Sequence, residues 1–211
     1  MALAIAKTAK AVSLRLPRLF SRKFGGIEKM SRKDYAHNPP HIFADDTAYF
    51  LTAAIYQKRP LLKDPKLKQL LLDRIKLCFA KYQWELHHWV ILDNHYHLLG
   101  KSRVGADLPK IIATIHAFVG YYVKQADRTQ ERVWWNYWDY CPRDERDYMI
   151  RLTYLFYNPV KHGYVDNLYD YQFSSFHNAF ATHGAEKLRQ QFKDFPEFRT
   201  LTLREAYDDD F

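Results

Sequence analysis

The chain has 211 residues, of which 47% are hydrophobic and 27% charged, so its composition excludes a disordered protein and favours one globular domain with appendages. A formal net charge of +8 favours a polyanionic partner, and because no apolar run approaches the length of a bilayer span, we expect no membrane association. The two cysteines lack metal-site spacing and argue against a disulfide framework, which fits a reducing cytoplasm.

Residues 1–40 are predicted to form a basic extension that packs loosely on the rest of the chain. Residues 1–27 hold six basic residues and no Asp or Glu. Three interpretations compete: an organellar targeting segment, a basic arm that contacts phosphates, or a mis-assigned start with true initiation at Met30. We favour either of the last two. Asn38-Pro39-Pro40 then separates this extension from the domain.

The next stretch predicts one strand, one helix and two more strands. The first strand spans 49–56 and is ended by Arg59-Pro60. A helix with leucine and isoleucine at helical spacing follows from Pro65 to about residue 82. Strands at 84–92 and 95–101 flank a turn at Asp93-Asn94.

The second half predicts two helices around an aromatic-rich extended segment. The helices cover 108–125 and 144–157, the extended segment covers 132–140, and Asn158-Pro159 is expected to end the second helix because a residue before proline disfavours helical dihedrals. This order predicts an α+β fold, with a ferredoxin-like antiparallel sheet and helices packed on its face. The domain is expected at 41–178, followed by a C-terminal tail at 179–211 that is acidic at its end.

Two histidines on the third predicted strand are the first candidate for chemistry. His95 and His97 are two residues apart, so on a strand they point to the same face. Imidazole is the commonest protein metal ligand, and such a pair is half of a metal site, although a purely structural pair is the alternative. His87 and His88 precede them; one must point to the opposite face from the other, and we expect structural or supporting roles for both.

The last predicted helix supplies a possible counterpart. Tyr154 and Asn158 are four residues apart and therefore share a helical face. A tyrosine nucleophile and an amide ligand could thus both face the histidine pair.

Taken together, these segments resemble the single-tyrosine HUH transposases, and among them the REP-associated tyrosine transposases. The resemblance spans roughly 49–177 and departs at Asp93, where the family often has proline. The motifs that carry it are residues 89–100 with their His-x-His pair, Trp135–Trp138 followed by 143–147, residues 154–163 with Asn-Pro-Val-Lys-His-Gly, and Phe173-Ser-Ser. It implies an HUH-type sheet for the domain at 41–178.

The resemblance also implies a role for each site residue. Tyr154 would be the catalytic nucleophile that forms a 5′-phosphotyrosine, with Tyr157 as the nearby competitor. His95, His97 and Asn158 would hold Mg²⁺ or Mn²⁺.

Candidate nucleic-acid contacts are weaker. We expect Lys161 and His162 either to contact phosphate or to cap the helix C-terminus. Arg143 could contact phosphate or form a solvated ion pair. Trp135 could stack on a base, although burial in the sheet is the main alternative for it and its aromatic neighbours.

The resemblance therefore implies a metal-dependent single-stranded DNA endonuclease and strand transferase that acts on hairpin, REP-type DNA. The protein would be a monomer or homodimer in the bacterial cytoplasm, associated with the nucleoid. Two alternatives stay open: a domesticated hairpin-binding protein that no longer cuts, and a metal phosphodiesterase that uses water. The acidic tail could screen the basic face.

Overall fold

The structure, a computed structural model, describes residues 41–203. The predicted basic extension at 1–40 and the acidic end of the chain lie outside the described residues. Four antiparallel strands form one sheet in the order β2-β3-β1-β4. The strands are β1 (Ala48–Ile55), β2 (Glu85–Ile91), β3 (His95–Lys101) and β4 (Trp134–Tyr140).

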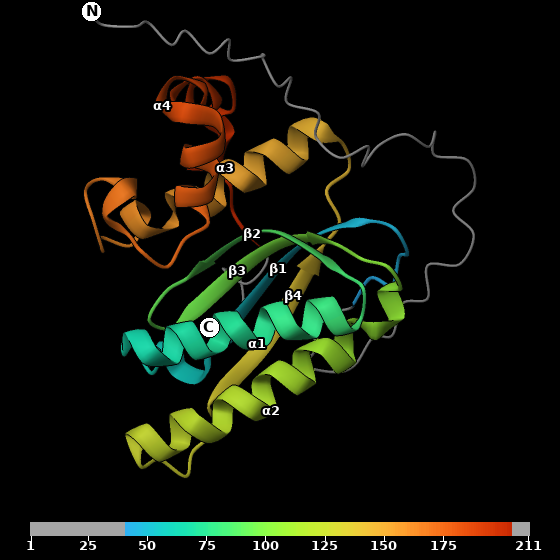
Figure 1. The fold of residues 1–211 in the computed structure, drawn as a ribbon, viewed down its shortest axis with the longest axis vertical. Coiled ribbons are helices and arrows are strands. Elements are labelled where there is room, and N and C mark those ends of the chain that lie inside the picture. Colours follow the sequence, from blue (N-terminus) through green and yellow to red (C-terminus); the bar gives the residue numbers. More distant parts are fainter. Residues whose placement is uncertain (1–40, 204–211) are drawn as a thin grey trace, which may run out of the picture.

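Helices cover both faces of this sheet. The helices are α1 (Pro65–Lys81), α2 (Leu108–Asp127), α3 (Glu145–Lys161) and α4 (Phe176–Asp194). Helices α1 and α2 lie on one face, and α3 and α4 lie on the other (Figure 1). Among the helices described between residues 41 and 203, none combines the length and apolar character needed to cross a bilayer.

The α+β prediction is confirmed. The chain order strand, helix, strand, strand, helix, strand and the sheet order together are those of the ferredoxin-like split unit. The prediction placed helices on one face, whereas the structure adds α3 and α4 as a second layer. This second layer is the one that contacts the candidate site.

Strand β1 is buried along its whole length because both of its faces are covered. Tyr49, Leu51 and Ile55 pack in the core against α1 and α2, whereas Phe50 packs in the core against α3 and α4. A strand covered on both sides reads as a continuous apolar run, which explains why β1 was recognisable from sequence.

Helix α3 begins at a capped residue and continues past a proline. The Asp144 side chain accepts a hydrogen bond from the backbone N–H of Asp147 at 2.8 Å. The prediction that Asn158-Pro159 ends this helix is wrong, since α3 runs to Lys161. Proline removes only one backbone donor here, and the final turn is still closed by the N–H of His162 on the carbonyl of Asn158 at 3.0 Å.

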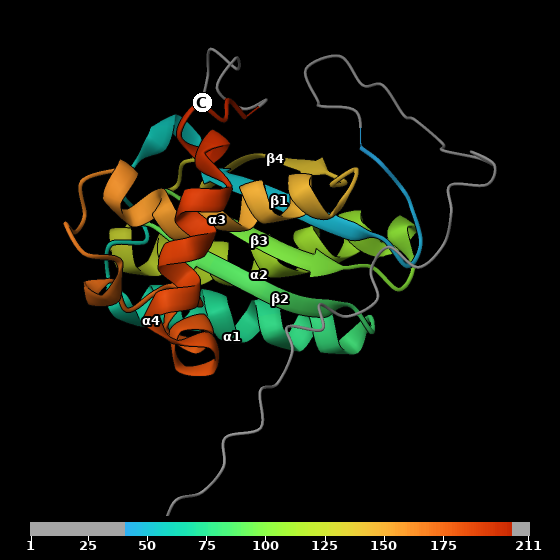
Figure 2. The same ribbon diagram turned by 90° about the horizontal axis from the view of Figure 1, so that it is seen from above.

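The predicted boundary at residue 178 falls inside α4, so the tail predicted at 179–211 begins within the folded domain. Ala179, Leu188 and Phe198 are buried in the core shared with α3, and Leu203 is buried as well. Figure 2 shows α4 crossing α3 on the same side of the sheet. The described part of this segment is therefore an integral layer of the fold.

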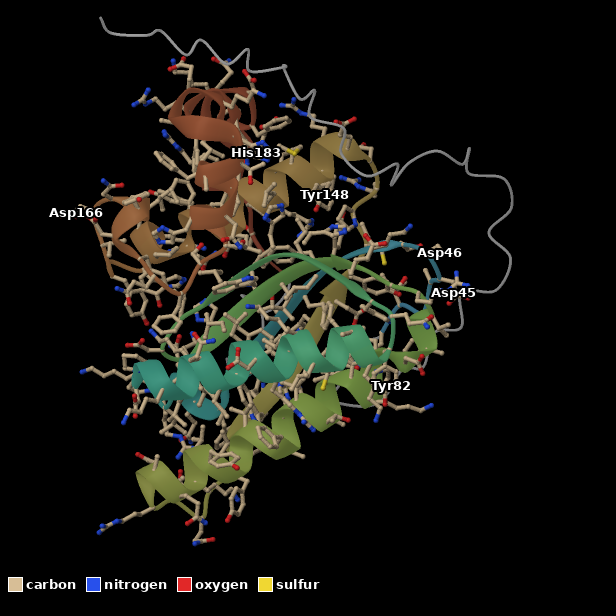
Figure 3. All side chains as sticks on the ribbon, in the orientation of Figure 1. Asp45, Asp46, Tyr82, Tyr148, Asp166 and His183 are labelled. Atoms are coloured by element: carbon tan, nitrogen blue, oxygen red, sulfur yellow. The ribbon has the colours of Figure 1, made fainter. Side chains whose placement is uncertain are left out.

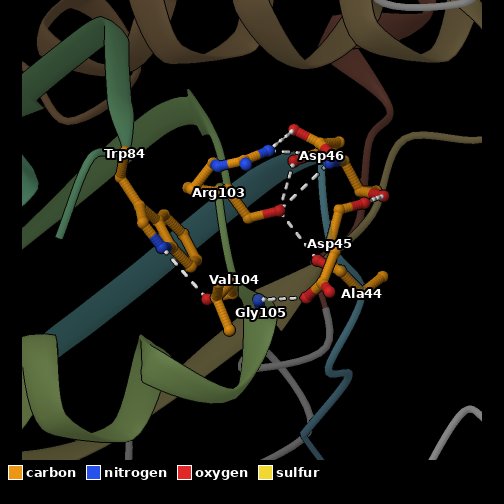
Figure 4. Close-up of polar contacts among 9 residues, drawn as sticks. Ala44, Asp45, Asp46, Trp84, Arg103, Val104 and Gly105 are labelled. Atoms are coloured by element: carbon orange, nitrogen blue, oxygen red, sulfur yellow. Dashed lines mark hydrogen bonds and ion pairs between the residues drawn. The ribbon is translucent and has the colours of Figure 1, made fainter.

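The connection from β3 to α2 is fastened to the segment that leads into β1 (Figure 4). The Ser102 hydroxyl donates to the carbonyl of Ala44 at 2.7 Å, and the N–H of Gly105 donates to Asp45 Oδ1 at 2.8 Å. A Cβ on Gly105 would lie 2.4 Å from the backbone nitrogen of Ala44, so only glycine permits this approach. These contacts hold the start of β1 beside the end of β3.

Candidate active site

His95 and His97 lie side by side on β3, beneath α3. Their ring centroids are 5.0 Å apart, and both side chains are buried. Strand β3 is an interior strand paired on both sides, so the backbone that carries the two imidazoles is held along its length. The predicted shared face is present in the structure.

Each imidazole has an oxygen partner on its Nδ1 atom. Thr52 Oγ1 lies 2.8 Å from Nδ1 of His97, and Asn94 Oδ1 lies 2.7 Å from Nδ1 of His95. Metal-binding histidines are commonly held in this way, with one ring nitrogen bonded to an oxygen and the other left to the metal. Thr52 and Asn94 thus fix the orientation of the two rings.

The Nε2 atoms converge on Asn158. Nε2 of His95 lies 3.4 Å from Oδ1 of Asn158, whose side chain is fully buried. Nε2 of His97 is buried and has no hydrogen-bond partner among the described residues. A buried polar atom without a partner is costly, and a metal ion would satisfy it.

The electrostatic setting keeps both imidazoles neutral. Burial, followed by the proximity of His162, lowers the pKa of His95 to about 3, and burial lowers the pKa of His97 well below its ordinary value. Neutral imidazole is the form that binds metals. Within residues 41–203, no group of three or more His, Cys, Asp or Glu side chains has an arrangement that could hold a metal ion. The candidate donor set is therefore two imidazoles and one amide, all neutral, and these could hold a divalent cation with further positions open.

Tyr154 lies against the histidine pair. Its side chain is buried, and its ring packs edge-on against His97 with centroids 5.6 Å apart. Lys161 Nζ donates a hydrogen bond to the Tyr154 hydroxyl at 2.9 Å and lies 4.6 Å from the ring centroid. Asn158 Nδ2 donates to the Tyr154 carbonyl at 3.1 Å. One helix therefore delivers the candidate nucleophile and the candidate third ligand to the same place.

Tyr157 has different surroundings. It is half-buried, and its ring packs edge-on against Phe198, with centroids 4.9 Å apart. Phe198 belongs to the short 3-10 helix Pro196–Arg199 that follows α4. The packing of Tyr157 thus favours Tyr154 as the nucleophile.

The structure divides the four candidate nucleic-acid contacts into two groups. Lys161 and His162 are exposed at the end of α3, and the His162 ring packs edge-on on His95 at 4.9 Å. Arg143 lies at the other end of the helix, where its backbone N–H and Nε contact Asp147 at 3.0 and 3.4 Å. Only the first group lies at the site.

Trp135 is half-buried on the edge strand β4. The guanidinium of Arg132 lies 4.7 Å from its ring, and the ring of Tyr56 lies 5.3 Å from it. Its neighbours Trp134 and Trp138 are buried, as the core interpretation expects. Trp135 is more accessible than either of these two tryptophans.

One prediction about the preceding strand is wrong: His87 and His88 both contact α3. Nδ1 of His87 lies 3.0 Å from the hydroxyl of Tyr148, which projects from α3 toward the sheet (Figure 3). The His88 ring packs edge-on against Phe156 at 5.4 Å. The β2–β3 pairing shifts register between Leu86 and His88, and such a bulge lets consecutive side chains share a face.

Three residues at the site were not predicted from the sequence: Thr52, Asn94 and Lys58. Asn94 could have been found, since it directly precedes the histidine pair. Thr52 could not, because its position opposite His97 depends on the pairing of two strands distant in sequence. The exposed Lys58 lies close enough to His95 to lower the pKa of the imidazole, after the larger effects of burial and His162.

Comparison with known proteins supports the family resemblance that the sequence motifs indicate. No protein-family model matches the chain. A Haemophilus influenzae protein assigned to the REP-associated tyrosine transposases is 28% identical over 153 residues, which cover 61% of this chain and 82% of that protein. The REP-associated tyrosine transposase of Escherichia coli is 29% identical over 97 residues, covering 44% and 55% of the two chains.

The fold agrees. A solved REP-associated tyrosine transposase bound to a REP hairpin superposes with a TM-score of 0.56 at 24% identity, over 71% of this chain and 86% of that one. The chain is a relative of the REP-associated tyrosine transposases. The fold shared with that solved structure is a four-stranded antiparallel sheet with helices packed against it.

Proposed function

We propose that the chain is a metal-dependent endonuclease and strand transferase that acts on single-stranded hairpin DNA of the REP type. The observation that carries this proposal is the meeting of Tyr154 and Asn158 on α3 with His95 and His97 on β3. The relatives named as transposases, and the neighbour solved with a REP hairpin, support the choice of DNA as substrate.

The proposed reaction uses Tyr154 as the nucleophile. Its hydroxyl oxygen attacks the scissile phosphorus, the bond between phosphorus and the 3′ oxygen breaks, and the tyrosine proton passes to solvent. The products are a 5′-phosphotyrosine and a 3′ oxygen that takes a proton from solvent to become a hydroxyl. The phosphotyrosine conserves the free energy of the diester, so attack by a 3′-hydroxyl rejoins DNA without ATP.

His95, His97 and Asn158 would hold Mg²⁺ or Mn²⁺. A bound divalent ion supplies positive charge that neutralises the phosphate oxygens and polarises phosphorus. Because all three donors are neutral, they would not cancel that charge. Thr52 and Asn94 would keep the imidazoles aimed through their Nδ1 contacts.

The exposed basic groups at the end of α3 would receive the DNA backbone. Lys161 lies beside Tyr154, and His162 lies beside His95. Lys58 is near enough to His95 to lower the pKa of that imidazole. Trp135 and Arg143 would contact DNA farther away, by stacking and by phosphate contact. In a bacterial cell the substrate would be DNA of the nucleoid, and we expect the protein to act as a monomer or homodimer.

A covalent-capture assay tests the proposal. Labelled single-stranded hairpin oligonucleotides are incubated with wild type, Tyr154→Phe, Tyr157→Phe and His97→Ala in Mg²⁺ or Mn²⁺, with EDTA as control, and run on a denaturing protein gel. We expect a metal-dependent covalent band that is lost in Tyr154→Phe and His97→Ala and kept in Tyr157→Phe.

Each other outcome would indicate a different nucleophile or a different function for this chain. Loss in Tyr157→Phe alone would move the nucleophile along the helix. Binding of the hairpin without any covalent band would indicate a protein that recognises hairpins and does not cut. Cleavage without a band would indicate a phosphodiesterase that uses water.

A further inference from the structure

Lys161 has a closer relationship to the nucleophile than a phosphate-binding or helix-capping lysine requires. Its ammonium donates to the Tyr154 hydroxyl at 2.9 Å, and Nζ lies 4.6 Å from the centroid of the tyrosine ring. A lysine that only caps a helix needs a bond to a terminal carbonyl, and one that only binds phosphate needs no contact with a tyrosine hydroxyl. The observed contact is with the atom that would attack phosphorus.

We propose that Lys161 is a positioning residue for Tyr154, holding its phenolic oxygen for attack and stabilising the charge on that oxygen when it leaves during strand rejoining. This inference rests on the proposed function. A phenol oxygen carries one proton and two lone pairs. The bond from the ammonium uses one of these two lone pairs.

The helix geometry explains why position 161 can do this. Side chains on a helix lean toward its N-terminus, and seven residues are close to two turns, so a long side chain at 161 reaches back over 154. That reach requires α3 to continue through Pro159 to Lys161, as it does. Lys161 is exposed as a whole, so its ammonium is placed at the border between solvent and the buried ring of Tyr154.

The charge has a role in both directions of the reaction. In cleavage the tyrosine oxygen becomes more negative as its proton departs, and in rejoining it departs as a phenolate when the bond between phosphorus and the tyrosine oxygen breaks. A fixed cation beside this oxygen lowers the barrier of both steps. A lysine that only binds phosphate would instead change the affinity for DNA.

The test compares Lys161→Met and Lys161→Arg with wild type in single-turnover covalent capture at saturating hairpin DNA. Lys76→Met is the matched control, because it removes one exposed lysine from α1 on the opposite face of the sheet. Thermal unfolding of each variant checks its fold. The dissociation constant for the uncut hairpin is measured separately in EDTA.

We expect Lys161→Met to slow adduct formation by about 100-fold, the scale of losing one donor to a developing charge. Rejoining should slow to a similar extent, the dissociation constant should change far less than the rate at saturating DNA, and Lys161→Arg should recover part of the rate. A second substrate carries sulfur in place of the scissile 3′ oxygen, which makes the departing group easy to expel. This substrate should remain slow with Lys161→Met, because the lysine acts on the nucleophile.

Four results would overturn the inference. Lys161→Met could cleave as fast as Lys76→Met, or lose only affinity for DNA, or recover fully on the sulfur substrate, which would assign the lysine to the leaving group. If wild type itself forms no adduct on a cognate hairpin, the proposed function fails and this inference fails with it.

Discussion

The hydroxyl of Thr52 lies 2.8 Å from Nδ1 of His97, across the pairing of β1 and β3 that sets these two residues opposite each other. Both groups are buried, and Nε2 of the same ring has no hydrogen-bond partner among the described residues. A ring held at one nitrogen and open at the other suits the metal-ligand role proposed for His97. The threonine is the group that decides which nitrogen stays open.

Thr52→Val should therefore weaken metal binding without unfolding the protein. Valine keeps the shape of threonine but leaves Nδ1 of His97 without its oxygen, and loss of such a supporting group lowers metal affinity by about 10- to 100-fold. Calorimetric titration with Mn²⁺ measures the change. Thr114→Val on α2, where the hydroxyl bonds to the Lys110 carbonyl, is the control. Equal Mn²⁺ affinity in both variants would show that Thr52 does not support a ligand.

Asp147 should make the stability of α3 depend on pH. Burial opposes its ionisation, but hydrogen bonds from the Arg143 backbone, the Tyr140 hydroxyl and Arg151 outweigh it, so its pKa is lowered in the folded protein. A carboxyl with a depressed folded pKa contributes stability above its unfolded pKa of about 3.9, and that contribution is lost as pH falls through the folded value.

Asp147→Asn should lower the free energy of unfolding by about 1.5–3 kcal/mol at pH 7, because it weakens hydrogen bonds that involve charged groups. The gap from wild type should shrink below about pH 4, where the wild-type carboxyl protonates. Urea unfolding between pH 2.5 and 7 measures it, with the exposed Asp166→Asn as control. A gap that stays constant over this range would contradict the assignment of the effect to the carboxylate charge.

Lys68 and Asp93 should show strong coupling. Lys68 is buried, its Nζ lies 2.7 Å from Asp93 Oδ1 and donates to the Tyr171 hydroxyl at 3.0 Å, and Tyr164 and Phe173 also surround it. Removing one member of a buried pair leaves the other charge uncompensated, so Lys68→Met should cost about 3 kcal/mol. The double variant Lys68→Met with Asp93→Asn should cost less than the sum of the single variants.

A double-mutant cycle by urea unfolding measures this coupling. The reference pair is Arg189 and Glu186, which are 69% and 84% exposed and should couple by less than about 0.5 kcal/mol. If the two cycles gave equal coupling energies, the buried pair would have no special role in holding the turn. This pair also gives a structural role to Asp93, where the resembled family often has proline, because its carboxylate joins the turn before His95 to α1.

Local signals explain which elements were predictable. Strand β3 was found with its bounds because a turn at Asp93-Asn94 precedes it, and α1 was found because Asp64 and Pro65 mark its start. The end of α3 was misplaced because the rule for residues before proline is local, whereas the buried Asn158 and Pro159 are held by tertiary packing. Helix α4 was missed because its apolar residues are sparse and Gly184 interrupts it with a positive φ.

The site, too, has features that the sequence predicts and features that depend on tertiary structure. His95, His97, Tyr154 and Asn158 could be proposed from spacing and from the resemblance, since each pair lies within one element. The contacts of Thr52 with His97 depend on strand register, and the shared face of His87 and His88 depends on a bulge. The contact of Lys161 with Tyr154 depends on a helix that continues through proline, which the sequence rule excluded.

Two short stretches of chain hold nearly the whole candidate centre: three residues of an inner strand and eight consecutive residues of one helix. Outside these two stretches, the strand needs only the Asn94 amide before it and a hydroxyl on the neighbouring strand. Residues 94–97 and 154–161 could therefore be transplanted together onto another ferredoxin-like sheet. The recipient would need a threonine opposite His97 and a helix that crosses the strand in the same way.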